Sequence, residues 1–294
     1  MTYTVLVPLD GSPLAEHSLT YLPALCRLGE VKLHLLSILD ETEEIHDLST
    51  ADVVDRERNV LSAYLHEIAS GIELLHGVKP VIETGVGVPG EVIQRRAAEL
   101  KPDLMVISTH GRSGISRWRH GSVAARLLHG ASCPILIVGP RAAARQGDWR
   151  EGESVSAFNS ILVPLDGSEL AEHALNTAAE VAQRFASTIH LVRVVRPPIR
   201  STGVTQAPHN LQEAAASYLL NIQERLLGDG EVLTSVQTGS VDDELEKYII
   251  GQKIELVVMT SHGRSGLVRA ALGSITDRLT GLGRAPILVV RAPG

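Results

Sequence analysis

The sequence is poor in cysteine: it contains only Cys26 and Cys133, and neither belongs to a Cys-x-x-Cys pair. This scarcity excludes a disulfide framework and a four-cysteine zinc site. No apolar run approaches the roughly 18 residues that a membrane-spanning helix requires. The N-terminus begins directly as a predicted strand, without the charged and apolar regions of a signal peptide. We therefore expect a cytoplasmic protein that does not span a membrane.

Aromatic residues are also scarce, at 3% of the chain, whereas hydrophobic residues as a whole make up 44%. The cores must therefore be aliphatic, and aromatic platforms for single-stranded nucleic acid are disfavoured. The formal net charge of −7 disfavours a broad nucleic-acid surface. There is no P-loop motif, no G-x-S-x-G elbow and no H-E-x-x-H helix, so we expect no assembled catalytic site.

The main feature that is present is an internal repeat. The segment VLVPLDGS at residues 5–12 returns as ILVPLDGS at 161–168, and STHGRSG at 108–114 returns as TSHGRSG at 260–266. A period this long indicates duplicated domains rather than a solenoid. We predict a first domain over 1–140, a linker over 141–158 and a second domain over 159–294.

Apolar runs and helical patterns alternate within each half. In the first half we predict strands near 4–9, 32–38, 79–84, 104–108 and 135–138. Helices are predicted from Ser12 to Gly29 and near 51–70, 89–100 and 122–129. This alternation indicates two tandem Rossmann-like, doubly wound α/β domains. Each should hold a five-stranded parallel sheet in the order 3-2-1-4-5, with ligands at the switch point between strands 1 and 4.

Asp10 and Asp166 follow the first strand of each half and precede a Gly-Ser pair. One interpretation is an acceptor for ribose or base groups, or an anchor for a metal that accompanies phosphate. The alternative is a turn aspartate that bonds its own backbone. The duplication and the place at the switch point favour a role in binding.

The glycine loops after the fourth strands are the phosphate candidates. Gly111 and Gly121-Ser122 in the first half return as Gly263 and Gly273-Ser274. A glycine loop that leads into a helix offers backbone N–H groups to an anion. Nearby arginines add positive charge (Arg112, Arg117, Arg119, Arg264 and Arg269), and we assign His110 and His262 to loop support rather than to a metal.

One segment imitates a dinucleotide fingerprint. Residues 85–90, Gly-Val-Gly-Val-Pro-Gly, match G-x-G-x-x-G between a strand and a helix. They follow the third strand, which is an edge strand in the predicted order, and the second half has no counterpart. We therefore do not interpret them as a nucleotide site.

Taken together, the strand-1 aspartate and the G-x2-G-x9-G-[ST] spacing resemble a tandem universal stress protein over nearly the whole chain. The ATP-binding branch of that family implies ATP, ADP or AMP as ligand, with or without Mg²⁺, and no further metal. Ser108 and Thr260 stand where the family has its first motif glycine. The implied nucleotide-binding residues are Pro8, Asp10, Gly11, Ser12, Ile38, Ser108, Gly111, Arg112, Gly121, Ser122 and Val123 in the first half, and Pro164, Asp166, Gly167, Ser168, Val194, Thr260, Gly263, Arg264, Gly273, Ser274 and Ile275 in the second.

The resemblance implies a nucleotide-responsive stress regulator with weak ATP hydrolysis at most. Two alternatives stay open: a stress protein that acts through protein contacts without nucleotide, and a nucleotidyl transferase or ATP pyrophosphatase. The apolar fifth strands of the two halves are edges that favour pairing. We expect them to pair the two domains inside one chain, and two chains to form a homodimer.

Overall fold

The structure is a computed structural model of the 294-residue chain. It describes residues 2–27, 29–41, 51–108, 122–130, 132–151, 158–196, 209–226, 230–260, 275, 278–280 and 283–291. Contacts within the chain divide it into two compact units, Met1–Val155 and Ser156–Gly294.

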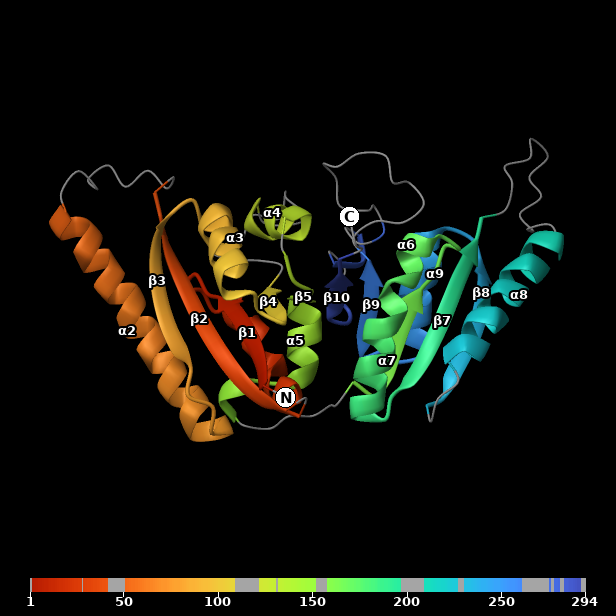
Figure 1. Cartoon of the computed structure of the whole chain (residues 1–294), viewed down its shortest axis with the longest axis horizontal. Helices are drawn as coiled ribbons and strands as arrows, with labels where there is room; N and C mark the ends of the chain where they lie inside the picture. Colours follow the sequence, from red (N-terminus) through yellow and green to blue (C-terminus); the bar gives the residue numbers. More distant parts are fainter. Residues whose placement is uncertain are drawn as a thin grey trace. The chain divides into compact units, whose positions relative to one another are not determined.

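The first unit alternates strands and helices in the predicted sequence (Figure 1). Four of its strands carry buried stretches of Val, Leu, Ile and Met, as expected for a parallel sheet covered on both faces, whereas the edge strand at residues 81–87 has no buried residue. The elements are β1 (Thr2–Pro8), η1 (Ala15–Tyr21), α1 (Leu22–Cys26), β2 (Glu30–Asp40), α2 (Ala51–His76), β3 (Val81–Gly87), α3 (Pro89–Leu100), β4 (Leu104–Ser108), α4 (Ser122–Gly130), β5 (Ile135–Val138), α5 (Pro140–Gln146) and η2 (Trp149–Glu151).

The second unit repeats the alternation over its described residues. Its strands β6, β9 and β10 are buried through their centres, as their counterparts are in the first unit. The elements are β6 (Ser160–Pro164), α6 (Glu169–Glu172), α7 (Ala174–Phe185), β7 (Thr188–Val195), α8 (His209–Leu226), β8 (Val232–Thr238), α9 (Val241–Gly251), β9 (Leu256–Thr260) and β10 (Ile287–Val290).

The strand order within each unit is the predicted one. In the first unit it is β3-β2-β1-β4-β5, and in the second β8-β7-β6-β9-β10. The recorded pairings between these strands are parallel. Figure 1 shows α2 and α3 on opposite faces of the first sheet, and both helices pack on β2 and β3. The doubly wound α/β fold is thereby confirmed.

The helix expected between Ser12 and Gly29 has a different form. It is a 3₁₀ helix, η1, followed by the short α1. Pro23 lacks the N–H that a continuous helix needs at that position. In addition, the Ser18 hydroxyl donates to the Ala15 carbonyl at 2.7 Å, and the Thr20 hydroxyl donates to the His17 carbonyl at 2.8 Å. These local bonds favour the tighter turns of η1.

Part of the segment expected to be a linker is folded onto the first unit. It contains α5 and η2, and the Tyr21 hydroxyl donates to the Ala142 carbonyl at 3.3 Å. Trp149 is buried. At the far end of the segment, Phe158 is buried in the second unit and meets the Phe185 ring edge-on, with centroids 5.3 Å apart.

Candidate functional site

The carboxyl ends of the first and fourth strands lie side by side in each unit. The parallel ladder pairs Val5 with Leu104 in the first unit and Ile161 with Leu256 in the second. The loops that leave β1 and β4 therefore begin at the same edge of the sheet, as do those that leave β6 and β9. This is the switch point at which open α/β sheets bind ligands.

Asp10 closes a tight turn at this edge. Its Oδ1 accepts hydrogen bonds from the Ser12 amide at 2.9 Å and from the Ser12 hydroxyl at 2.6 Å. The Ser12 hydroxyl oxygen in turn accepts from the Ala15 amide at 3.1 Å, where η1 begins. Gly11 between them has φ = 82°, a left-handed conformation that favours glycine.

The second unit reproduces this turn. Asp166 Oδ1 accepts from the Ser168 amide at 2.9 Å and from its hydroxyl at 2.6 Å. The Ser168 hydroxyl oxygen caps α6 by accepting from the Ala171 amide at 3.2 Å, and Gly167 has φ = 84°. The turn interpretation of the aspartate is confirmed, because the amide and hydroxyl of the serine two residues on bond its carboxylate at the switch point. The binding role of the aspartate stays a prediction.

A carboxylate that the sequence analysis missed lies beneath each turn, buried in the first unit and half-buried in the second. Glu16 and Glu172 each stand six residues after the turn aspartate. Glu16 accepts from the hydroxyl of Tyr64 on α2 at 3.3 Å, and Glu172 accepts from that of Tyr218 on α8 at 3.0 Å. The repeated Asp-x5-Glu spacing was the available signal.

These tyrosines remain protonated donors. Burial, together with the Glu16 carboxylate, raises the pKa of Tyr64 far above its ordinary value. Burial and the Glu172 carboxylate do the same to the pKa of Tyr218. Asp10 and Asp166 contribute to these rises, so each Tyr–Glu pair is electrostatically coupled to the turn above it.

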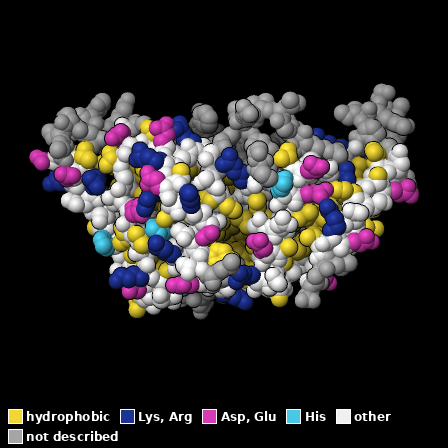
Figure 2. Space-filling model, in the orientation of Figure 1, with side chains coloured by type: hydrophobic (Ala, Val, Ile, Leu, Met, Phe, Trp, Pro, Cys, Tyr) yellow, Lys and Arg dark blue, Asp and Glu magenta, His cyan; other side chains and the backbone are white. Residues whose placement is uncertain are grey.

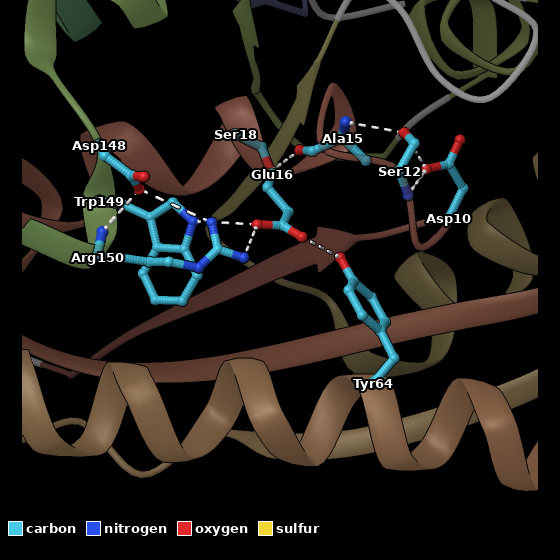
Figure 3. A network of polar contacts seen from close by, with 9 residues as sticks. All are labelled: Asp10, Ser12, Ala15, Glu16, Ser18, Tyr64, Asp148, Trp149 and Arg150. Carbon is cyan, nitrogen blue, oxygen red and sulfur yellow. Dashed lines mark hydrogen bonds and ion pairs between the residues drawn. The ribbon is translucent and has the colours of Figure 1, made fainter.

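The cation that balances this glutamate differs between the units. In the first unit, Arg150 of η2 contacts Glu16 Oε2 at 2.5 Å, and the Trp149 indole N–H donates to the same oxygen at 3.3 Å (Figure 3). In the second unit, Arg225 of α8 contacts Glu172 Oε2 at 2.6 Å. The first unit thus takes its balancing charge from the segment after β5.

The remaining sequence-predicted residues fall into two groups. Ile38 and Val194 lie near the carboxyl ends of β2 and β7, each half-buried. Ser108 ends β4 half-buried, whereas Thr260 ends β9 fully buried. Pro8 and Pro164 end the first strands, Ser122 begins α4, and Val123 and Ile275 are half-buried. The phosphate candidates Gly111, Arg112, Gly121, Gly263, Arg264, Gly273 and Ser274, together with His110, His262, Arg117, Arg119 and Arg269, lie outside the described residues.

A second polar cluster lies near the amino-terminal part of each sheet. Buried His34 contacts Glu83 at 3.1 Å, and Arg96 forms two hydrogen bonds with Glu83, at 2.5 and 2.7 Å. In the second unit, His190 contacts Ser160 at 3.2 Å and the Tyr248 hydroxyl at 3.0 Å. Because these groups lie toward the start of the strands, we separate them from the candidate site.

Charged side chains of both signs are interspersed over the face shown in Figure 2. Within the described ranges, no group of three or more metal-ligating side chains gathers in one place. Among the described helices, none combines the length and apolarity needed to cross a bilayer.

Two doubly wound α/β units, each with an acidic turn at its switch point, define a duplicated α/β protein. The family model described as the universal stress protein family matches residues 1–139 and again 157–291. The chain belongs to the universal stress protein family, and the resemblance drawn from its motifs is confirmed in both halves.

Individual relatives agree with this assignment. The chain is similar to universal stress protein Rv2005c of Mycobacterium tuberculosis, with 29% identity over 199 residues, or 64% of this chain and 62% of that relative. It thus spans less than two thirds of that relative's length. YxiE of Bacillus subtilis is 26% identical over 147 residues, covering 46% of this chain and 99% of YxiE.

A solved structure supports the fold. The crystal structure of a universal stress protein from Archaeoglobus fulgidus covers 98% of both chains with a TM-score of 0.75 and 20% identity. This likeness shows the two-unit fold alone.

Proposed function

We propose that each unit binds one adenine nucleotide at its switch point and that the protein is a nucleotide-responsive regulator of the stress response, not a dedicated enzyme. The observation that carries the proposal is the duplicated turn. Asp10 with Ser12 and Asp166 with Ser168 form the same hydrogen bonds, with the same two distances. In both halves this turn holds a carboxylate at the switch point, where open α/β sheets bind ligands.

The roles follow from the chemistry of the groups present. A carboxylate held at the strand end can accept hydrogen bonds from ribose hydroxyls. The backbone near Ile38 and Val194 can read the edge of the base, since these residues lie at the ends of the neighbouring strands. The glycine loops that follow β4 and β9 would receive the phosphates, with Mg²⁺ accompanying ATP.

The proposal extends to the setting of the protein. We propose a cytoplasmic location, pairing of the two units through β5 and β10, and a homodimer. The domain limits 1–140 and 159–294 likewise stay predictions. Covalent cross-linking between single cysteines placed on β5 and β10 tests the pairing, because a cross-link should form quantitatively only if the two strands are neighbours.

The binding proposal is tested by replacing both turn aspartates with asparagine. The Asn side-chain oxygen can still accept from the Ser12 and Ser168 amides, so the fold should persist. Loss of two carboxylates should lower the affinity for ATP at least tenfold in calorimetric titration, because hydrogen bonds to charged groups are the stronger ones.

A matched control removes two carboxylates at the opposite edge of the sheets. Glu30 and Glu231 each accept from a threonine hydroxyl at 2.8 Å, near the start of β2 and of β8. Changing both to Gln removes the same charge and should leave ATP affinity unchanged. Equal ATP affinity in the Asp10→Asn, Asp166→Asn variant and in wild type would remove these turns from the site. Absence of any ATP binding by wild type would favour a protein that acts through protein contacts.

A further inference from the structure

Arg193 of β7 lies over the candidate site of the second unit. A Cβ built at Gly167 would come within 3.0–3.1 Å of its guanidinium atoms. The guanidinium also stacks on the Tyr218 ring, 4.8 Å from the centroid. Gly167 directly follows Asp166, so a cation is held against the turn that the proposed nucleotide would touch.

The first unit has no such cation at the equivalent position. The β1–β2 register pairs Pro8 with Leu36, and the β6–β7 register pairs Pro164 with Val192. Ser37 is therefore the counterpart of Arg193. Ser37 is fully buried, and its hydroxyl has no hydrogen-bond partner among the described residues.

No ion pair between Arg193 and a carboxylate is recorded among the described residues of the second unit. Glu172 below the turn is already balanced by Arg225, just as Glu16 is balanced by Arg150. Within the described part of the second unit, the recorded contact of the Arg193 side chain is its stacking on the Tyr218 ring. Stacking on Tyr218 fixes the plane of the guanidinium, whose N–H groups are hydrogen-bond donors.

We propose that Arg193 makes the second site selective for the phosphate charge of its ligand, so that the two sites of one chain are not equivalent. The inference rests on the proposed nucleotide binding and assigns it a specificity. The second site takes polyphosphate-bearing nucleotides and discriminates against monophosphates. The first site discriminates less, because Ser37 stands where the second unit has Arg193.

The test compares the sites one at a time in the full-length chain. Asp10→Ala leaves the second site, and Asp166→Ala leaves the first. Titration calorimetry of each variant with ATP, ADP and AMP at constant ionic strength gives the ATP-to-AMP affinity ratio. We expect this ratio to be about tenfold larger at the second site, since one hydrogen bond to a charged group is typically worth at least that factor.

Arg193 is then changed in the chain that retains the second site. Arg193→Gln should remove most of the excess ratio, and Arg193→Lys should retain part of it because the charge stays. Lys247→Gln, which removes one positive charge paired with Glu244 on α9, is the control and should leave the ratio unchanged. Circular dichroism confirms that each variant is folded.

The outcomes separate the two proposals. Two results would overturn the role of Arg193 and leave nucleotide binding intact. The first is an equal ATP-to-AMP affinity ratio at the two sites. The second is an Arg193→Gln variant whose ratio is unchanged, including one in which the affinities for AMP and ATP rise by the same factor. A wild-type protein that binds none of the three nucleotides overturns both. The inference is supported if the ATP-to-AMP affinity ratio is larger at the second site, and if Arg193→Gln lowers this ratio whereas Lys247→Gln leaves it unchanged.

Discussion

The Trp149 indole packs directly against Gly71 of α2: a Cβ built at Gly71 would lie 3.3 Å from Trp149 Cη2. The same indole donates its N–H to Glu16, which is 133 positions away in sequence. Gly71 and Arg225 both stand seven residues after the tyrosine that bonds the glutamate beneath the turn, Tyr64 or Tyr218. The second unit thus has Arg225 on α8, whereas the first has Gly71 at the equivalent position on α2. The missing side chain of Gly71 leaves space for Trp149, and Arg150 follows it in sequence.

Filling this space should displace the indole. Gly71→Leu forces a branched side chain against a buried ring, and overpacking of this kind costs about 1–3 kcal/mol. We expect a lower Tm and a shift of tryptophan emission to longer wavelength, measured with Trp118→Phe so that Trp149 is the sole tryptophan. Gly251→Leu is the control, because a Cβ at Gly251 of α9 has no atom within 4 Å. Unchanged emission from the Gly71→Leu protein would contradict the packing.

Removal of the balancing arginine should cost more in the first unit than in the second. The Glu16 side chain is 9% exposed and that of Glu172 is 24% exposed, so Glu16 depends more on its partner. Because Arg150 is itself half-exposed, we expect Arg150→Ala to lower the free energy of unfolding by about 1–2 kcal/mol. Denaturant titrations should show a smaller loss for Arg225→Ala. The reverse order would show that burial of the carboxylate does not decide the effect.

The stability contributed by Glu83 should disappear in acid. Hydrogen bonds from Arg96 hold the pKa of Glu83 below its ordinary value of 4.5, with His34 contributing. A carboxyl group whose pKa is lower in the folded state stabilises that state above the unfolded pKa and ceases to do so as the pH falls through the folded value. Glu83→Gln should therefore lower Tm at pH 7, and the difference from wild type should shrink below about pH 4.5. A difference that stays constant down to pH 3 would show that the glutamine acts through packing instead. Ser235→Ala, at the counterpart position on β8, should show no such pH dependence.

Much of the fold could be predicted from the sequence because the signals are local. The bounds predicted from continuous apolar runs, 104–108 and 135–138, are those observed for β4 and β5. Pro89 at the start of α3, and Lys101-Pro102 after its end, delimited that helix. The exact repeat of Leu-Asp-Gly-Ser after the first strand of each half then predicted an acidic turn at each switch point.

The parts that could not be predicted depend on contacts between distant residues. No local sequence pattern predicts the contact of Trp149 with Glu16. The alanine-rich stretch before Trp149 was therefore interpreted as part of a linker. Pro140 at the start of α5 was an available helix signal. The position of Arg193 over Gly167 likewise depends on the pairing of β6 with β7. The sequence therefore left open whether the two sites are equivalent, whereas the structure distinguishes their surroundings.

The most direct test of the central claim is the small-molecule content of the protein. The protein is purified without added nucleotide and denatured, and the released molecules are identified by chromatography and mass spectrometry. Our account predicts an adenine nucleotide, with up to one molecule for each of the two units and ATP or ADP in excess over AMP. Protein that releases no nucleotide, and that also takes up none when incubated with ATP and Mg²⁺, would contradict it.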